Sequence, residues 1–325
     1  QLLDKAGARP PFYVYDDLMG WTVGPNRRSE NGLYYSSSER IRAPHEGVSF
    51  AQLKEKTRIA LVGDSYTFGE DVAYEDTWGY LLEKALGPEF EVLNFGVPGY
   101  GVDQAYLRYE KDVRKWKPKV VIFSFISHDV ERTMTVYTPL SYPEWDMPFS
   151  KPRFILRDGD LTKLNVPPLA SEAIFSRGSV SELPFLEFDR GYRQSDWRQS
   201  FFHFSYLARA FMIWFPRWEA VTPDVSDEAL VLVNASILKA FVRSAEQAGA
   251  APVVVYHPKK GFAAGSLGKQ VLQEAGLAYT DPTSCLLELD PADWFIPHGH
   301  YTPQGNAAVA KCLLNVVRQA LVKVS

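Results

Sequence analysis

The sequence predicts an α/β protein in which a doubly wound parallel sheet lies between two layers of helices. Four short apolar runs carry this prediction, because each is rich in Val, Ile or Phe and has the length of a buried strand. Amphipathic segments separate the runs, and this alternation is typical of a parallel sheet covered on both faces. The four runs are Arg58–Gly63, Phe90–Phe95, Lys119–Ile126 and Pro252–Tyr256.

The segments between these strands have apolar residues at helical spacing. In the first of them, Trp78, Leu81, Leu82 and Leu86 recur along one face. Ser226 is a plausible N-cap for a later helix, since Asp and Glu follow it and favour the positive end of the helix dipole. The expected helices are Thr77–Leu86, Asp103–Trp116, Ser226 to about Gly249, Gly265–Ala275 and Pro303 to about Val322, with a weaker strand near Leu277–Thr280.

Two segments lie outside the alternation. Residues 1–57 are polar and rich in Gly and Arg, so we expect an arm that wraps the main domain of residues 58–325. Residues 130–225 carry many prolines and aromatics and are expected to form a large insertion over the active-site end. Within it, Arg153–Val166 predicts a hairpin that turns at Asp158–Gly159. The aromatics of the insertion either cover the site or build a small core of their own.

Composition narrows the possible partners. A net charge of −4 gives no basic surface of the kind that binds nucleic acid, so we expect no nucleic-acid partner. No apolar run is long enough for a membrane span in this chain. Two cysteines, Cys285 and Cys312, either pair or stay reduced. The sequence starts at Gln1 and not at Met, so one expectation is that a leader or anchor precedes it in the natural protein. A periplasmic or extracellular location is the corresponding expectation. The oligomeric state stays open.

The strongest local signal follows the first strand, in the sequence Gly63-Asp64-Ser65-Tyr66-Thr67-Phe68-Gly69. A serine at a strand-to-helix turn projects its hydroxyl into the cleft, and its own N–H can meet a developing oxyanion. The hydroxyl is a weak nucleophile unless a base is adjacent. Taken alone, the segment is a weak motif, because many Gly-x-Ser turns are only helix caps.

Three further blocks stand at places where a sheet of this kind gathers its ligands. Asn94–Gly101 follows the second strand and is rich in glycine, which allows close approach of backbone N–H groups to an anion. Ser127-His128-Asp129 follows the third strand, and His298-Gly299-His300-Tyr301-Thr302-Pro303 precedes the last helix. Since the carboxyl ends of parallel strands meet at one edge, we expect these groups to converge.

The four blocks, in this order, resemble the SGNH/GDSL hydrolase superfamily. Ser65 matches its nucleophile, Gly99 its second-block glycine, and His300 its base within the typical His-Tyr-Thr-Pro-x-Gly sequence. The resemblance covers about residues 55–130 and 230–322, and it implies the flavodoxin-like three-layer fold of this superfamily. It also implies an oxyanion hole formed by the N–H groups of Ser65 and Gly99 with a third-block side chain, and no metal or other cofactor.

Two positions depart from the family pattern. His128 stands where the third block carries Asn; a neutral imidazole has one N–H and could still donate to an oxyanion, or it packs without a role. His298 stands two residues before His300, where an acidic residue usually orients the base. Asp293 could reach His300 if the loop folds back; otherwise the site is a Ser–His dyad or has lost its activity.

The resemblance therefore implies a serine-dependent ester hydrolase or acyl-transfer enzyme, with an acylated saccharide or similar small ester as the leading substrate class. A lipid esterase or thioesterase is the first alternative, with the insertion as an acyl-chain pocket. A non-catalytic carbohydrate-binding protein on a degenerate SGNH fold is the second. A nucleotide binder is disfavoured, because no phosphate-binding fingerprint follows the first strand.

Overall fold

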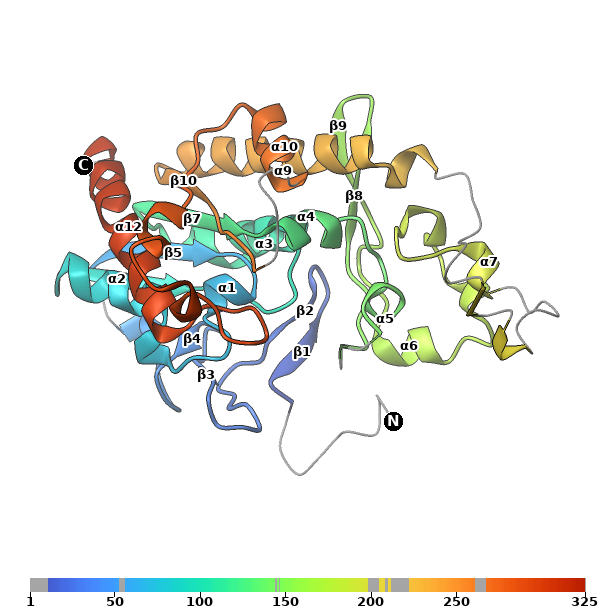
Figure 1. Ribbon diagram of the computed structural model, residues 1–325, viewed down its shortest axis with the longest axis horizontal. Helices are drawn as coiled ribbons and strands as arrows, with labels where there is room; N and C mark the ends of the chain where they lie inside the picture. Colours follow the sequence, from blue (N-terminus) through green and yellow to red (C-terminus); the bar gives the residue numbers. More distant parts are fainter. Residues whose placement is uncertain are drawn as a thin grey trace.

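The computed structural model of the protein describes residues 11–52, 56–143, 145, 147–197, 205–207, 210–211, 222–260 and 267–324. Its centre is a four-stranded parallel sheet in the order β10, β7, β5, β6 (Figure 1). The chain enters at β5, moves outward to β6, and returns across β5 to β7 and β10, so the strand order reverses between β5 and β7. Such a switch point leaves a crevice at the carboxyl ends of the strands. The expected α/β fold with a parallel sheet is confirmed. The strands are β5 (Thr57–Val62), β6 (Phe90–Asn94), β7 (Val120–Phe125) and β10 (Ala251–Tyr256).

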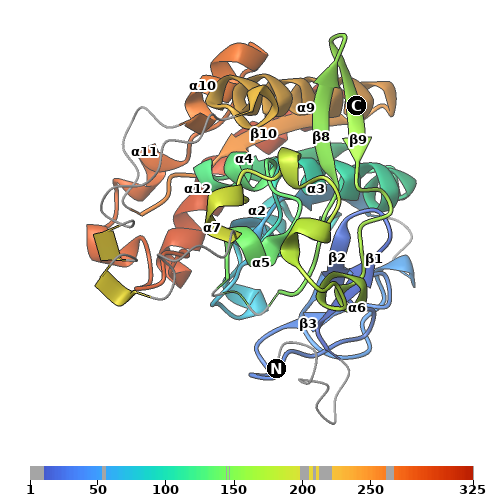
Figure 2. The ribbon, with the colours of Figure 1, turned by 90° about the vertical axis from the view of Figure 1, so that its right-hand side faces the viewer.

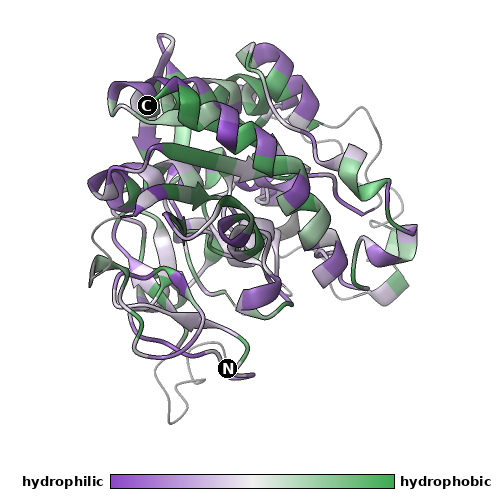
Figure 3. Ribbon diagram, turned by 90° about the vertical axis from the view of Figure 1, so that its left-hand side faces the viewer, coloured by the Kyte–Doolittle hydropathy of each residue, from purple (hydrophilic) through white to green (hydrophobic). Residues whose placement is uncertain are grey.

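Helices cover both faces of the sheet. Successive residues of a strand point to opposite faces, so Ile59 and Leu61 pack with α2 (Trp78–Leu86) and α12 (Pro303–Lys323). Ala60 and Val62 point the other way, toward α3 (Val102–Arg108) and α9 (Asp227–Gln247). In Figure 3 the strands are green between helices that are purple on their outer sides. This is the three-layer arrangement that the sequence predicts.

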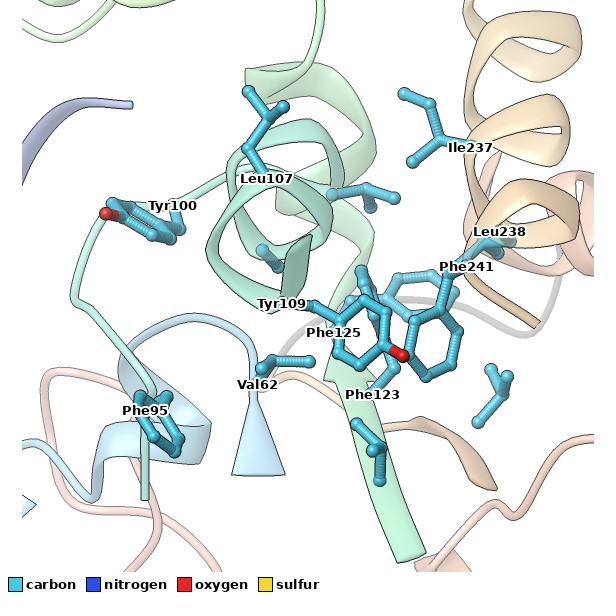
Figure 4. Close-up of a cluster of buried hydrophobic side chains, with 14 of the residues drawn as sticks. Val62, Phe95, Tyr100, Leu107, Tyr109, Phe123, Phe125, Ile237, Leu238 and Phe241 are labelled. Carbon is cyan, nitrogen blue, oxygen red and sulfur yellow. The ribbon is translucent and has the colours of Figure 1, made fainter. Parts of the chain in front are cut away.

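Aromatic side chains fill the α9 side of the core (Figure 4). Phe123 of β7 lies 4.8 Å from Phe241 of α9, centroid to centroid, and Tyr109 meets the same ring edge-on at 5.2 Å. All three rings are buried. The contacts lock β7 against α9, and β7 runs directly into the third block of the candidate site.

Two expected elements differ in the structure. The helix expected over 103–116 ends its α-helical part at Arg108 and continues as a π-helical turn over Tyr109–Val113, which keeps both of these residues buried. The expected weak strand near Leu277–Thr280 is reduced to a single parallel bridge between Val255 and Thr280. Pro282 follows closely and has no N–H to extend the pairing.

The arm contains two short antiparallel pairs, and the insertion contains the expected hairpin (Figures 1 and 2). The hairpin turns at Asp158 and Gly159, both with positive φ, as predicted. The insertion also has a small apolar cluster of its own around Tyr137, Ile174 and Leu186. The division into arm, main domain and insertion stays a prediction. The elements are β1 (Tyr13–Asp16), β2 (Gly20–Val23), β3 (Tyr35–Ser36), β4 (Arg42–Ala43), β8 (Arg153–Arg157), β9 (Asp160–Leu164), α5 (Thr138–Ser141), α6 (Ser171–Phe175) and α7 (Gln194–Trp197).

Three further short helices of the main domain are α4 (Ser127–Arg132), α10 (Leu267–Ala275) and α11 (Thr283–Leu286). Cys285 of α11 and Cys312 of α12 form a disulfide with a Cα–Cα distance of 5.8 Å, which decides between the two states left open by the sequence. Within the described ranges, no helix combines the length and apolarity that a membrane crossing needs.

Candidate active site

Ser65 is the first residue of the short helix α1 (Ser65–Phe68), directly after β5. Asp64 caps this helix, and its carboxylate accepts a hydrogen bond from the Tyr66 N–H at 3.0 Å. Gly63 is required for close approach, because a Cβ there would collide with Thr67 Oγ1 and the Ser124 carbonyl oxygen. The turn therefore places the Ser65 hydroxyl at the carboxyl edge of the sheet, and the side chain is almost fully buried.

His300 comes from the segment before α12 and meets Ser65 across the fold. Its Nε2 lies 3.0 Å from Ser65 Oγ, although 235 residues separate the two. The Tyr66 hydroxyl donates to the Gly299 carbonyl oxygen at 2.5 Å and ties the two segments together. Thr302 then caps α12 by accepting the Gly305 N–H at 2.9 Å. The expected neighbourhood of Ser65 and His300 is present.

Two carboxylates that no sequence motif indicates flank the His300 ring. Asp71 Oδ2 lies 2.6 Å from Nδ1, on the side of the ring away from Ser65. Glu70 Oε2 lies 3.4 Å from Nε2, and burial raises the pKa of the Glu70 carboxyl while the nearby His300 opposes that shift. The available signal was an acidic pair just after Gly69, the last residue of the block that carries the nucleophile.

The two orienters expected from the sequence lie elsewhere. His298 and Asp293 are both exposed. Asp293 contributes its backbone carbonyl to the Thr302 hydroxyl, and the carboxylate bonded to His300 Nδ1 is that of Asp71. The loop before α12 turns at Gly299, where φ is 103°. This loop does not bring the Asp293 carboxylate to His300, as an orienting role for Asp293 would require.

The second block lies against the nucleophile turn. The Asn94 side-chain amide donates to the Thr67 carbonyl oxygen at 2.8 Å, and the Val97 N–H donates to the Gly63 carbonyl oxygen at 3.1 Å. Gly99 has a φ of 82°, in the left-handed region that favours glycine. A Cβ at Gly99 would lie 3.3 Å from Trp145 of the insertion. The Trp145 ring thus packs against the loop that carries Gly99, the expected oxyanion donor.

His128 is the second residue of α4 and lies beside Lys259. The Lys259 Nζ lies 2.5 Å from Nδ1 and 2.9 Å from Nε2 of the imidazole. Burial, together with the positive charges of Lys259 and Arg132, lowers the pKa of His128 to about 4. The ring is therefore neutral at physiological pH and keeps one N–H. That is the state in which it could donate to an oxyanion.

A buried charge network lies beside the nucleophile turn. The Arg132 guanidinium lies 2.6 Å from Asp129 Oδ1 and 3.7 Å from Asp64 Oδ2. Burial raises the pKa of both carboxyls, and the Arg132 charge opposes that rise. Because Asp64 caps α1, which begins at Ser65, the network helps to fix the position of the nucleophile.

His257, just after β10, lies under both catalytic segments. Its ring stacks on Tyr66 with centroids 6.0 Å apart, and its Nδ1 lies 3.3 Å from the Tyr301 hydroxyl. The side chain is completely buried, and this burial lowers its pKa to about 3. His257 therefore packs as a neutral, buried side chain beneath the Ser65 and His300 segments. In the described ranges, no group of three or more side chains is arranged to hold a metal ion.

Residues 59–144 match the family model described as GDSL-like Lipase/Acylhydrolase. The matched segment runs from β5 to α5 and includes Ser65, Gly99 and His128. The match over this segment confirms the resemblance to GDSL-type hydrolases that the motifs predict, and it supports an SGNH-type hydrolase. No curated protein matches the chain.

Solved structures of lipase/acylhydrolase and esterase proteins are similar to this chain at low identity. A lipase/acylhydrolase from Enterococcus faecalis is 13% identical, with 82% of this chain and 97% of that chain covered and a TM-score of 0.43. A catalytic mutant of an acetylxylan esterase from Geobacillus stearothermophilus is 16% identical, with 80% and 93% covered and a TM-score of 0.40. An esterase from Pseudoalteromonas sp. is 11% identical, with 82% and 100% covered and a TM-score of 0.42.

Proposed function

We propose that this GDSL-type protein is an ester hydrolase or acyltransferase in which Ser65 is the nucleophile and His300 the base. The observation that carries the proposal is the 3.0 Å contact between Ser65 Oγ and His300 Nε2. Distances of this size allow direct proton transfer between a hydroxyl and an imidazole. His300 is one-fifth exposed, so a substrate can reach the pair from solvent.

The reaction would proceed in two balanced halves. His300 Nε2 takes the Ser65 proton as Oγ forms a bond to the ester carbonyl carbon, and the carbonyl oxygen becomes an oxyanion. When the carbonyl re-forms, the bond to the alcohol oxygen breaks and His300 returns the proton to that oxygen. Water, or an acceptor hydroxyl, then repeats the sequence on the acyl-serine and regenerates Ser65.

The oxyanion would be held by the backbone N–H groups of Ser65 and Gly99 and by the His128 ring. Ser65 begins a helix, where N–H groups point toward the cleft, and the positive φ of Gly99 allows the second loop to approach closely. The low pKa of His128, about 4, supports a neutral ring that donates rather than a charged one. Removal of one such donor commonly costs about 10²–10³ in rate.

The surroundings of the pair favour a short acyl group on a polar alcohol, such as an acylated saccharide. Trp145 and Met147 each lie 3.3 Å from the position of a Gly99 Cβ, so the space beside the oxyanion loop is narrow. The carboxylates of Glu70 and Asp71 flank the base, near Nε2 and Nδ1 respectively, and both are partly exposed, so they offer acceptors for sugar hydroxyls. Esters of this kind are small-molecule substrates.

A lipid esterase is the second candidate, and one observation favours it. The insertion contains a cavity of about 280 Å³ lined mainly by apolar side chains, and a long acyl chain is an occupant of suitable chemistry. The lining includes Leu140, Ile174, Leu183 and Trp197.

Labelling with a fluorophosphonate probe tests the proposal. The wild-type protein should be modified stoichiometrically, and Ser65→Ala should lose both labelling and about 10⁴-fold or more of its turnover of p-nitrophenyl acetate. A higher kcat/KM for the acetyl ester than for the octanoyl ester supports the short-acyl substrate, and the reverse order supports the lipid esterase. Absence of labelling from about pH 6 to about pH 9 would instead support a non-catalytic saccharide-binding protein.

A further inference from the structure

The carboxylate beside His300 comes from an unexpected part of the chain. Asp71 follows the nucleophile by six positions in the sequence and precedes His300 by 229. Its Oδ2 lies 2.6 Å from Nδ1, the ring nitrogen that faces away from Ser65. A carboxylate at this place accepts the Nδ1 proton, which leaves the Nε2 lone pair free to accept the proton of the serine hydroxyl.

The backbone of Asp71 has a conformation that needs support. Its φ is 69°, in the left-handed region that residues other than glycine adopt rarely, although aspartate tolerates it better than most. Gly69, two residues earlier, also has a left-handed φ of 77°. Non-glycine residues keep such angles only when surrounding contacts hold them, and these residues are frequent at active sites.

The N-terminal arm supplies those contacts. The Asp71 N–H donates to the Tyr34 hydroxyl oxygen at 2.9 Å, and the Arg42 Nη2 donates to the Val72 carbonyl oxygen at 3.2 Å. Burial raises the pKa of Tyr34 to about 12, so its hydroxyl stays neutral over the working range. The arm thus binds the backbone on both sides of the Asp71 carbonyl.

The two arm residues are themselves fixed by Phe68, the last residue of α1. The Arg42 guanidinium lies over the rings of both Tyr34 and Phe68, at 4.7 Å from each centroid. The Tyr34 and Phe68 rings meet edge-on at 5.1 Å. The cluster therefore joins the nucleophile helix, the Asp71 turn and the arm into one unit.

We propose that Asp71 is the positioning carboxylate of His300 and that Tyr34 and Arg42 of the N-terminal arm hold it in place. The proposal rests on the Ser65–His300 function proposed above. It assigns the acidic role to the loop after the nucleophile instead of the loop before the base, and it makes the arm a part of the catalytic apparatus. Glu70 has a different place, since its carboxylate lies toward Nε2, the nitrogen that serves Ser65.

The test compares four variants by their pH profiles of kcat/KM on p-nitrophenyl acetate: Asp71→Asn, Tyr34→Phe, Glu70→Gln and Asp293→Asn. Asp71→Asn should lower kcat/KM by about 10²-fold or more, because the imidazolium loses its counter-charge and the tautomer is no longer fixed. The acidic limb should also move to lower pH, since loss of a neighbouring anion lowers the pKa of the base. A purely structural role would not move this limb.

Tyr34→Phe keeps the ring packing and removes only the acceptor for the Asp71 N–H, so a smaller loss of about 10-fold with a shift in the same direction is expected. Asp293→Asn is the matched control, since its carboxylate is exposed, and it should stay within about 3-fold of wild type. Glu70→Gln should leave the acidic limb closer to wild type than Asp71→Asn does. Melting temperatures identify any variant that fails to fold.

The outcomes separate this proposal from the one on which it rests. If Ser65→Ala abolishes labelling but Asp71→Asn keeps the wild-type rate and profile, the positioning role is overturned while the Ser–His function stands. A loss in Asp293→Asn as large as that in Asp71→Asn would overturn it in the same way. If Asp71→Asn behaves as expected and a folded Tyr34→Phe does not differ from wild type, the role of the arm is overturned. Absence of serine labelling in the wild type would sink both proposals.

Discussion

The two segments that meet at the catalytic pair are held in different ways. The Ser65 segment lies inside the main domain, where the hydroxyls of Thr67 and Ser124 bond to each other and Arg132 neutralises the capping Asp64. The His300 segment lies near the surface, between exposed residues and α12. It is held by the Tyr66–Gly299 hydrogen bond and lies in the chain segment that the Cys285–Cys312 disulfide closes. The nucleophile therefore follows from the sheet, whereas the base depends on tertiary contacts.

The largest effect is expected where the nucleophile segment is buried. Arg132→Met would leave the Asp64 and Asp129 carboxylates inside the protein without the guanidinium that lies between them. Breaking a buried ionic network by removing one partner typically costs about 3–5 kcal/mol. Urea unfolding should show this loss. The loss of stability should be smaller at lower pH. The pKa of the Asp64 and Asp129 carboxyls is raised, so protonation there removes the charge that Arg132 no longer balances.

Arg114→Met is the matched control for this change. Arg114 forms a partly exposed helix pair with Glu110 at 2.7 Å, and removal of such a pair costs only about 0–1 kcal/mol. Equal losses for the two variants would mean that the nucleophile segment gains nothing from its buried network.

The base segment should respond most to the disulfide. Cys285 and Cys312 are 27 residues apart and enclose the loop that carries His300. For a loop of that length the chain-entropy model gives a stabilisation of about 3.5 kcal/mol, within the usual range of about 2–4. Cys285→Ser/Cys312→Ser should unfold at correspondingly lower urea concentration, and dithiothreitol should lower the stability of the wild type but not of this variant.

Activity of the same double variant sharpens the contrast. Ser65 should still react with a small fluorophosphonate at low temperature, since its own segment is intact, while thermal inactivation becomes faster. A loss of stability below about 1 kcal/mol would show that α12 and the Thr302 cap hold the base without covalent help.

The difference between the segments also explains what the sequence could predict. Ser65 follows a continuous apolar strand, and His300 precedes a long amphipathic helix, so both positions are readable from periodicity. Asp71 is not, because its role depends on a left-handed turn and on a contact with a residue 229 positions away. Tyr34 and Arg42 belong to no motif, and their place against the Asp71 turn is fixed only by tertiary packing. For the same reason an acid near His300 in sequence, Asp293, was the more obvious choice.

The smallest expected effect concerns His257, which touches both segments through Tyr66 and Tyr301. Its pKa is lowered from 6.5 to about 3 in the folded protein, so between these values the unfolded chain binds a proton that the native state does not. Stability is fully present above about pH 6.5 and falls as the solution becomes more acidic, by about 2 kcal/mol from about pH 7 to about pH 5. His257→Phe should flatten this slope even if its stability at neutral pH is lower.

Part of the slope should remain in that variant, because the pKa of His128 is also lowered, to about 4, and acts in the same direction. His45→Gln is the control, since His45 is exposed and hydrogen-bonds only locally, to the Glu46 carbonyl oxygen. Urea unfolding of the three proteins at several pH values measures the slopes. If His257→Phe loses as much stability on acidification as the wild type, then the buried His257, which contacts both the nucleophile and the base segment, is not the source of the acid sensitivity of the fold.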